Sequence, residues 1–109
     1  MEKGNKKDYQ KLYRAILSLK NEEECQAFFE DLYTISELDA AAQRLKVAGM
    51  LHKKYTCGHI SEVTGASTAT VSRVNKCLNY GSGGSRMVLA RLEDGEDNKY
   101  TREGVKKAA

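Results

Sequence analysis

Residues 58–78 read GHISEVTGASTATVSRVNKCL, and this stretch decides the fold of the chain. A short helix is predicted to end at Gly65, because glycine readily adopts the positive φ of a sharp turn. Ser67 or Thr68 would then cap a second helix. Two helices joined in this way form a helix-turn-helix, an arrangement that many DNA-binding proteins use.

The second of these helices separates apolar from polar residues. With Val71 at the centre of the buried side, a turn of about 3.6 residues places Val74 and Leu78 beside it. The opposite side is small, hydroxylated and basic, which suits the major groove of DNA. An ordinary solvated face has a similar composition, so the turn glycine and the cap carry much of this interpretation. The predicted DNA-binding residues are Ser67, Thr68, Ala69, Thr70, Ser72, Arg73 and Lys76.

Length and composition favour one small helical domain. The chain has 109 residues, of which 40% are hydrophobic, and this is enough for a core. It contains no proline and only 7% aromatic residues, whereas the helix-favouring alanine, leucine, glutamate and lysine are frequent. We therefore predict an all-α fold of about six helices. A domain of this size would gain stability from a core shared by two subunits.

Positive charge is concentrated in the middle of the chain. The net charge of +3 says little by itself, but residues 1–40 hold six Lys or Arg against nine Asp or Glu. Residues 41–86 hold seven Lys or Arg against Glu62 alone. This basic half contains the predicted helix-turn-helix. Local positive charge attracts phosphates, so the distribution supports a DNA-binding module.

Neither a membrane span nor a secretory signal is predicted. No apolar run approaches the roughly 20 residues that cross a bilayer, and the N-terminal MEKGNKK leads into no signal sequence. We expect a cytoplasmic protein. Cys25, Cys57 and Cys77 are odd in number and widely spaced, which argues against a disulfide framework and fits a reducing compartment. Each is expected to be a buried or half-buried thiol.

Three helices are predicted before the helix-turn-helix. Residues 8–19 place their apolar side chains on one helical stripe. Asn21 is expected to cap the second helix, with glutamates in its first turn where the helix dipole favours them. Ser36 is expected to cap the third, with Asp39 completing a variant of the capping box. These three helices, assigned to residues 8–54, are the predicted dimerisation helices.

The segment after the helix-turn-helix is read as a connection, a last helix and a tail. Residues 79–85 hold three glycines but lack the spacing of a phosphate-binding loop, which predicts a helix stop. Apolar side chains in residues 85–92 predict a short helix that closes the core. Half of residues 94–109 are charged, which predicts a flexible tail. Residues 1–93 are accordingly assigned to a single helical DNA-binding domain.

The predicted helix-turn-helix, which we call the reader, and parts of the helix before it are similar in sequence to a known family. The strings AQRL at 42–45, TGASTATVSRVN at 64–75 and LNYG at 78–81 resemble the tryptophan-repressor-like family, in particular its bacterial and phage-related branch. The likeness spans roughly residues 8–92, and only the ASTATVSRVN string is specific. The resemblance implies an intertwined, all-helical homodimer whose two helix-turn-helix heads read a palindromic operator.

The resemblance also implies the place of an effector site. In this family two arginines enclose the indole ring of tryptophan; Arg44 and Arg73 match them, and Cys77 lies beside the same pocket. The founding repressor has glycine after the second arginine, whereas Val74 would occupy the ligand's space or pack into the core. We predict no cofactor and do not expect tryptophan as corepressor. We expect a repressor that either needs no ligand or is regulated differently, for example by another small-molecule effector.

Two other classes of function remain open. A protein-interaction module or accessory factor could retain this fold without sequence-specific DNA binding, and alanine at Arg73 and Lys76 would leave its function intact. An enzyme is not predicted, because Cys57 and His59 form no recognised metal-ligand pair and lack an orienting acid. The sequence favours a dimeric transcriptional regulator that binds double-stranded DNA and acts as a repressor.

Overall fold

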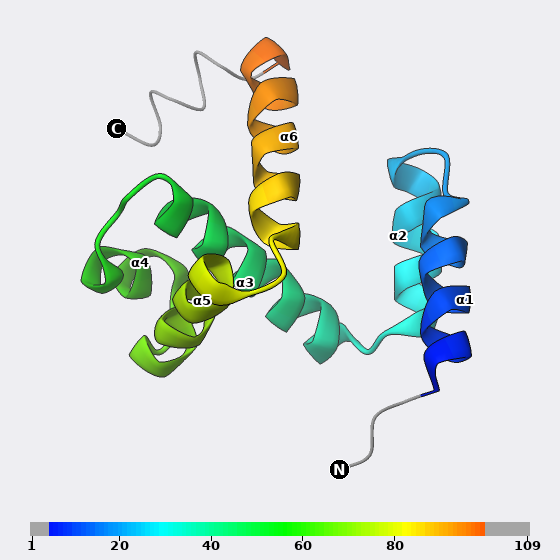
Figure 1. Cartoon of the computed structure of the whole chain (residues 1–109), viewed down its shortest axis with the longest axis horizontal. Helices are drawn as coiled ribbons and strands as arrows, with labels where there is room; N and C mark the ends of the chain where they lie inside the picture. Colours follow the sequence, from blue (N-terminus) through cyan, green and yellow to red (C-terminus); the bar gives the residue numbers. More distant parts are fainter. Residues whose placement is uncertain (1–4, 100–109) are drawn as a thin grey trace. The chain divides into compact units, whose positions relative to one another are not determined.

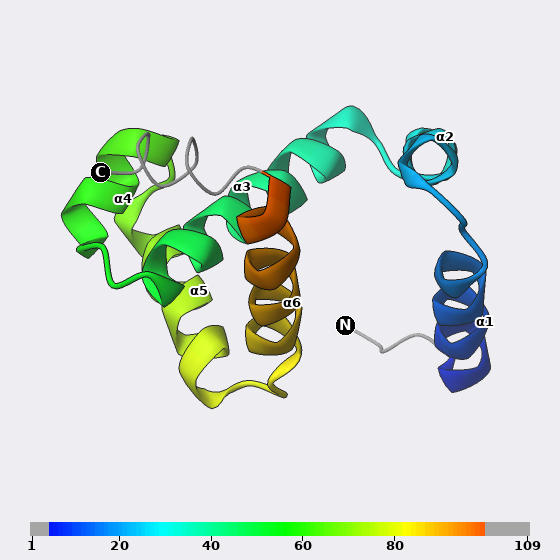
Figure 2. The same ribbon diagram turned by 90° about the horizontal axis from the view of Figure 1, so that it is seen from above.

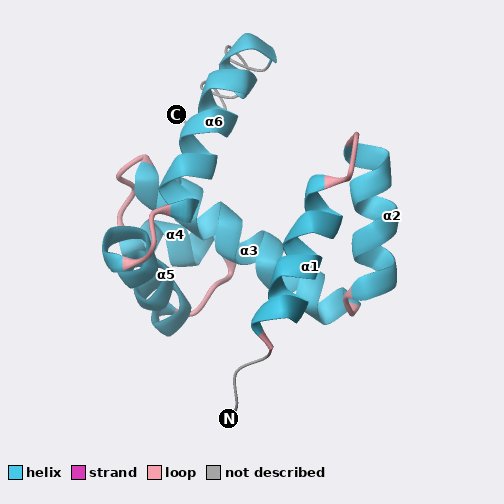
Figure 3. Cartoon of the chain, turned by 45° about the vertical axis from the view of Figure 1, so that its right-hand side comes forward, coloured by secondary structure: helices cyan, strands magenta, loops and turns pink. Residues whose placement is uncertain are grey.

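The all-α class predicted from the sequence is confirmed. The structure is a computed structural model that describes the backbone of residues 5–99 and the side chains of residues 5–93. Figures 1 and 2 show the order of its helices, and Figure 3 shows only helices and loops in this part of the chain. The helices are α1 (Lys6–Leu17), α2 (Glu22–Leu32), α3 (Ile35–His52), α4 (Cys57–Thr64), α5 (Thr68–Tyr80) and α6 (Gly84–Lys99). None of them is long and apolar enough to cross a membrane.

The chain divides into two compact units, Met1–Asp39 and Ala40–Ala109, where the sequence predicts one domain over residues 1–93. The first unit contains α1, α2 and the first residues of α3. The second contains the rest of α3 together with α4, α5 and α6. The helix-turn-helix therefore belongs entirely to the second unit.

Asparagine side chains begin both helices of the first unit. The Oδ1 atom of Asn5 accepts a hydrogen bond from the Lys7 amide at 2.7 Å, and that of Asn21 accepts one from the Glu24 amide at 2.8 Å. The Asn21 cap is the one predicted. Because Asn5 also acts as a cap, α1 begins at Lys6, two residues before the predicted start. No side chain of α1 or α2 is buried.

The start of α3 differs from the prediction. The Thr34 hydroxyl accepts a hydrogen bond from the Glu37 amide at 3.1 Å, and the Glu37 carboxylate accepts one from the Thr34 amide at 2.8 Å. This is a complete capping box, in which the side chain of each residue accepts a hydrogen bond from the otherwise unpaired backbone amide of the other. The predicted pair of Ser36 and Asp39 is wrong, because the Thr-x-x-Glu pattern two residues earlier has the more usual glutamate. The helix ends at His52.

The second unit has a continuous apolar core. Its buried residues come from every helix of the unit and from the turn between α4 and α5. They are Val47, Ala48, Ile60, Ala66, Val71, Val74, Leu78 and Leu89. The side chains of Met50, Leu51 and Tyr55 pack against them. α4 and α5 lie side by side in this unit, as Figures 1 and 2 show.

The last helix is longer than predicted. α6 runs to Lys99, beyond the closing helix expected over residues 85–92 and into the segment predicted as a flexible tail. Residues 100–109 of that predicted tail lie outside the described residues. Of the predicted apolar residues of this helix, only Leu89 is buried; Met87, Val88 and Leu92 are exposed.

Candidate nucleic-acid interface

The turn between α4 and α5 has the geometry predicted for a helix-turn-helix. Gly65 ends α4 with φ +77° in the left-handed region, and its amide donates to the Ser61 carbonyl at 2.9 Å. A side chain at this position would be strained, although a Cβ atom would meet nothing within 4 Å. Of the two predicted caps it is Ser67 that begins α5, because its Oγ accepts from the Thr70 amide at 3.1 Å.

A network of hydroxyl groups holds this turn. The Ser61 hydroxyl donates to the Ala66 carbonyl at 2.6 Å, and the Thr64 hydroxyl donates to the Ile60 carbonyl at 2.7 Å. Thr64 also accepts a hydrogen bond from the Ala66 amide at 3.1 Å. From α3, the side-chain amide of Gln43 donates to the Thr64 carbonyl at 3.3 Å. These polar contacts were not predicted, since a hydroxyl in a sequence does not show which carbonyl it will reach.

The two faces of α5 are those predicted from its periodicity. Val71, Val74 and Leu78 are buried in the core of the second unit. The predicted DNA-binding residues on the other side are exposed. They are Ser67, Thr68, Ala69, Ser72, Arg73 and Lys76. Thr70, the remaining predicted contact, is only half-buried, and its hydroxyl accepts a hydrogen bond from Ser67 at 3.1 Å. Thr70 therefore supports the cap as well as bordering the exposed face.

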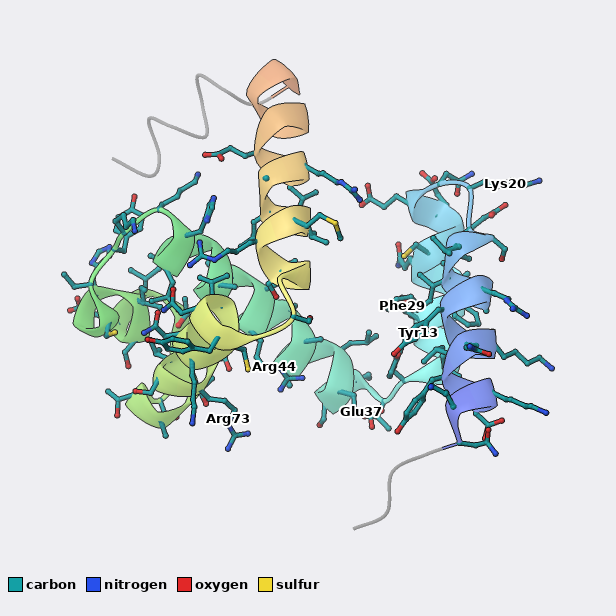
Figure 4. All side chains as sticks on the ribbon, viewed as in Figure 1. Tyr13, Lys20, Phe29, Glu37, Arg44 and Arg73 are labelled. Carbon is teal, nitrogen blue, oxygen red and sulfur yellow. The ribbon has the colours of Figure 1, made fainter. Side chains whose placement is uncertain are left out.

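The two basic side chains of this face have no partner among the described residues. Arg73 and Lys76 make no ion pair or hydrogen bond within residues 5–93. Figure 4 shows Arg73 projecting outward from α5. Neither the first turn of α5 nor any other part of it contains an acidic residue. Their positive charge is thus available to a negatively charged molecule outside the chain.

Tyr80 is an interface candidate that sequence reasoning missed. Its side chain is 83% exposed at the C-terminal end of α5. It follows Arg73 by seven residues and Lys76 by four, and both spacings place it on the same side of the helix. This spacing was the available signal. The exposed face therefore extends along the whole of α5 and ends in an aromatic ring.

The residues of the predicted effector site are all exposed. Arg44 lies on α3, whereas Arg73 and Cys77 lie on α5, and Figure 4 shows the two arginines on these separate helices. Neither arginine makes an ion pair or hydrogen bond with another described residue. The sequence left open whether Val74 occupies the ligand's space or packs into the core. In the structure it packs into the core cluster. A core valine therefore stands at the position where the founding repressor has glycine.

The exposure of the thiols differs in part from the prediction. Cys25 is half-buried as expected, but Cys57 and Cys77 are exposed. Cys57 is the first residue of α4, and near it the ring of His59 stacks on that of Tyr55, with centroids 5.3 Å apart and an interplanar angle of 25°. Within the described residues, no three His, Cys, Asp or Glu side chains are grouped so that they could hold a metal ion.

Comparisons with known proteins agree with this geometry. The family model of the Trp repressor protein matches residues 7–93. The uncharacterized protein YerC of Bacillus subtilis (strain 168) is 51% identical over 90 residues, which cover 83% of this chain and 86% of that protein. The solved structure of a TrpR-like protein from Eubacterium eligens superposes with a TM-score of 0.78 and 48% identity, covering 82% of this chain and 92% of that one. A Staphylococcus aureus structure, also named for the Trp repressor, has the same TM-score at 43% identity, with 82% and 89% covered. The chain belongs to the Trp repressor family.

Proposed function

We propose that this chain is a homodimeric transcriptional repressor that reads a palindromic DNA operator through α4 and α5. Membership of the Trp repressor family makes a helix-turn-helix regulator the natural class. The observation that carries the proposal is the exposed face of α5, where Arg73 and Lys76 have no hydrogen-bond or ion-pair partner among the described residues. Arg73 would contact a guanine edge or a phosphate, and Ala69 would allow close approach to a thymine methyl.

The surrounding charge supports the same proposal. Of the acidic residues in the chain, only Glu62 lies between residues 41 and 86, against seven Lys or Arg. The second unit therefore carries a net positive charge around its reader. DNA binding releases counterions from each neutralised phosphate, so a basic reader gains affinity at low salt.

The first unit supplies the argument for a dimer. Leu17 is 83% exposed and Ile35 79% exposed, and no side chain of α1 or α2 is buried. A unit whose apolar side chains all stay at least partly exposed is suited to a partner that covers them. Units below about 40 residues rarely bury enough apolar surface to be stable alone. A second copy of the chain would cover these side chains and the exposed Met87, Val88 and Leu92 of α6.

Two-fold symmetry then determines the kind of site. Two recognition helices related by a two-fold axis enter successive major grooves when they lie about 34 Å apart, which corresponds to half-sites about 10 base pairs apart. The operator would accordingly be palindromic. Because a core valine, Val74, stands where the founding repressor has glycine, we expect this spacing to be reached without tryptophan.

Selection of bound fragments from random DNA tests the proposal directly. The purified protein would be incubated with the pool at physiological salt, with and without tryptophan. We expect enrichment of a palindrome with half-sites about 10 base pairs apart, to the same extent in both arms. Failure to prefer any sequence over bulk DNA would contradict the proposed function and favour a protein-interaction role. Enrichment only with tryptophan would contradict the expected independence of that ligand.

Alanine variants of the basic residues test the assigned contacts. Arg73→Ala should weaken operator binding about 10- to 100-fold if Arg73 reads a base. Lys76→Ala should weaken binding to all sequences alike and lower the salt dependence by about one unit of slope. Lys11→Ala is the matched control, because Lys11 is an exposed lysine of the first unit. Equal effects of all three substitutions would mean that α5 is not the reader.

A further inference from the structure

A side chain of α6 holds the end of the recognition helix. The Nε atom of Arg86 donates to the Leu78 carbonyl at 2.9 Å, and its Nη2 atom donates to the Asn79 side-chain oxygen at 2.7 Å. The side-chain amide of Asn79 in turn donates to the side-chain oxygen of Asn75 at 3.0 Å. One guanidinium group therefore contacts both the backbone and the side chains of the last turn of α5.

The position of this contact makes it more than an ordinary surface hydrogen bond. The last four carbonyls of a helix have no partner within the helix, and a cation near them is favoured by the helix dipole. The planar guanidinium donates to two acceptors from separate nitrogens at a fixed angle, whereas the three donors of an ammonium group rotate about one nitrogen and fix no such angle. Arg86 therefore constrains the direction of α5 relative to α6 as well as satisfying the Leu78 carbonyl.

The connection between the two helices cannot supply this constraint by itself. Residues 81–84 contain three glycines, and Gly83 has φ +91°. A chain rich in glycine has few side chains to restrict its path. Apart from Arg86, the buried Leu89 of α6 joins the apolar core in which Leu78 of α5 also lies. An apolar contact is non-directional, so the directional contribution comes from Arg86.

The same helix, α6, also belongs to the proposed dimer contact. Met87, Val88 and Leu92 are exposed on this helix and would be covered by the second copy. We propose that Arg86 is a positioning residue, which transmits the placement of α6 in the dimer to the recognition helix and so sets the separation of the two readers. This inference rests on the proposed function, because it concerns the geometry of the same reader.

Hydrogen exchange without DNA tests the contact independently of any operator. Arg86→Ala and Arg86→Lys should both speed amide exchange in residues 78–81, since alanine donates no hydrogen bond and lysine lacks the rigid planar group that bonds the two acceptors from separate nitrogens. Asn79→Ala removes one acceptor without changing α6 and should have a smaller effect in the same direction. Arg91→Ala is the charge-matched control, because Arg91 is an exposed arginine of α6 that makes no hydrogen bond with another described residue.

Binding to a spacing series tests the consequence. Operators would be compared whose half-sites are moved apart or together by one base pair. The unchanged protein should lose affinity steeply when the spacing changes, whereas Arg86→Ala and Arg86→Lys should show a flatter dependence and a several-fold weaker affinity at the best spacing. The salt dependence should stay the same in both variants, because a positioning residue releases no counterion. Sedimentation should confirm that the variants remain dimers.

The outcomes distinguish the possible roles of Arg86. A fall of about one in the salt slope for Arg86→Ala would indicate a direct phosphate contact and would overturn the positioning role. Full spacing selectivity in Arg86→Lys would show that charge suffices, and would overturn it as well. Unchanged exchange in residues 78–81 would mean that the contact does not hold α5. If no specific operator existed, the proposed function would fail and this inference with it, even if the exchange measurement supported the contact itself.

Discussion

The two units of the chain differ in how far their apolar side chains are buried. All buried side chains among residues 5–93 lie in the second unit, between Val47 and Leu89. The first unit has half-buried residues, such as Phe29 with its neighbouring rings at 5.3 and 6.0 Å, but it has no buried one. The second unit can thus hold its helix-turn-helix through its own core. The first unit has apolar side chains suited to a core, but it has too few helices to bury them.

This difference follows from the number of helices that meet. An amphipathic helix buries its apolar stripe only against neighbours. The second unit combines parts of four helices, which enclose Ile60 and Val71 from several sides. The first unit has two whole helices and the start of α3, and these leave Leu17 of α1 and Ile35 of α3 exposed to water. The comparison therefore supports the proposal that the second unit stabilises the helix-turn-helix through its own core, whereas the first unit contributes mainly to association.

The largest expected effect concerns association. Leu17→Glu should raise the dimer dissociation constant at least about a hundredfold, because each buried leucine contributes about 1.5–3 kcal/mol and two copies are lost per dimer. Analytical ultracentrifugation over a concentration series would measure it. Lys11→Glu is the control, since Lys11 lies on the opposite side of α1 from this stripe. A dimer equally stable in both variants would show that Leu17 faces water in the assembly.

The next effect concerns the core of the second unit. Ile60→Ala should lower the free energy of unfolding by about 2–5 kcal/mol, because the Ile60 side chain is 0% exposed and its loss leaves a cavity. Urea denaturation would measure the change. Val63→Ala on the same helix should cost under about 1 kcal/mol, since Val63 is 48% exposed. Similar losses for the two variants would mean that a partner covers Val63 as well.

A pair of glycines in the helix-turn-helix separates backbone strain from packing. Gly65→Ala should cost about 1–2 kcal/mol, because Gly65 has φ +77°. Gly58→Ala should stabilise the protein by up to about 1 kcal/mol, because Gly58 lies within α4 and a Cβ atom there meets nothing within 4 Å. Thermal and urea unfolding would measure both. If Gly58→Ala destabilised the protein as much as Gly65→Ala, the cost at Gly65 could not be assigned to its backbone conformation.

Periodicity and turn chemistry made the second unit largely predictable from the sequence. Val71, Val74 and Leu78 were assigned to the buried face from their spacing alone, and Gly65 from the turn that it forms. Both signals are local, so they need no knowledge of the neighbouring helices. The exposure of the predicted DNA-binding face followed from the same periodicity, but its contact with DNA stays a prediction.

Features that depend on distant residues could not be predicted in this way. The hydrogen bond from Gln43 to the Thr64 carbonyl joins residues 21 apart in sequence, and Arg86 reaches back across a glycine-rich connection. Neither polar side chain indicates its acceptor before the helices are placed. The exposed thiols of Cys57 and Cys77 were wrongly expected to be buried or half-buried, because residue type is only a weak guide to burial.

The smallest expected effect concerns the cap at the start of α3, which lies within the first unit. Thr34→Ala should lower the free energy of unfolding by about 1 kcal/mol, since the Thr34 hydroxyl accepts from the Glu37 amide. Ser36→Ala should change it by less than about 0.5 kcal/mol or stabilise the helix slightly, because Ser36 lies inside α3, where alanine is the better helix former. Urea denaturation of the two variants side by side would measure the difference. A larger cost at Ser36 would restore the cap expected from the sequence. A cost at Thr34 that grows when Leu17→Glu weakens the dimer would show that association and the start of α3 stabilise each other.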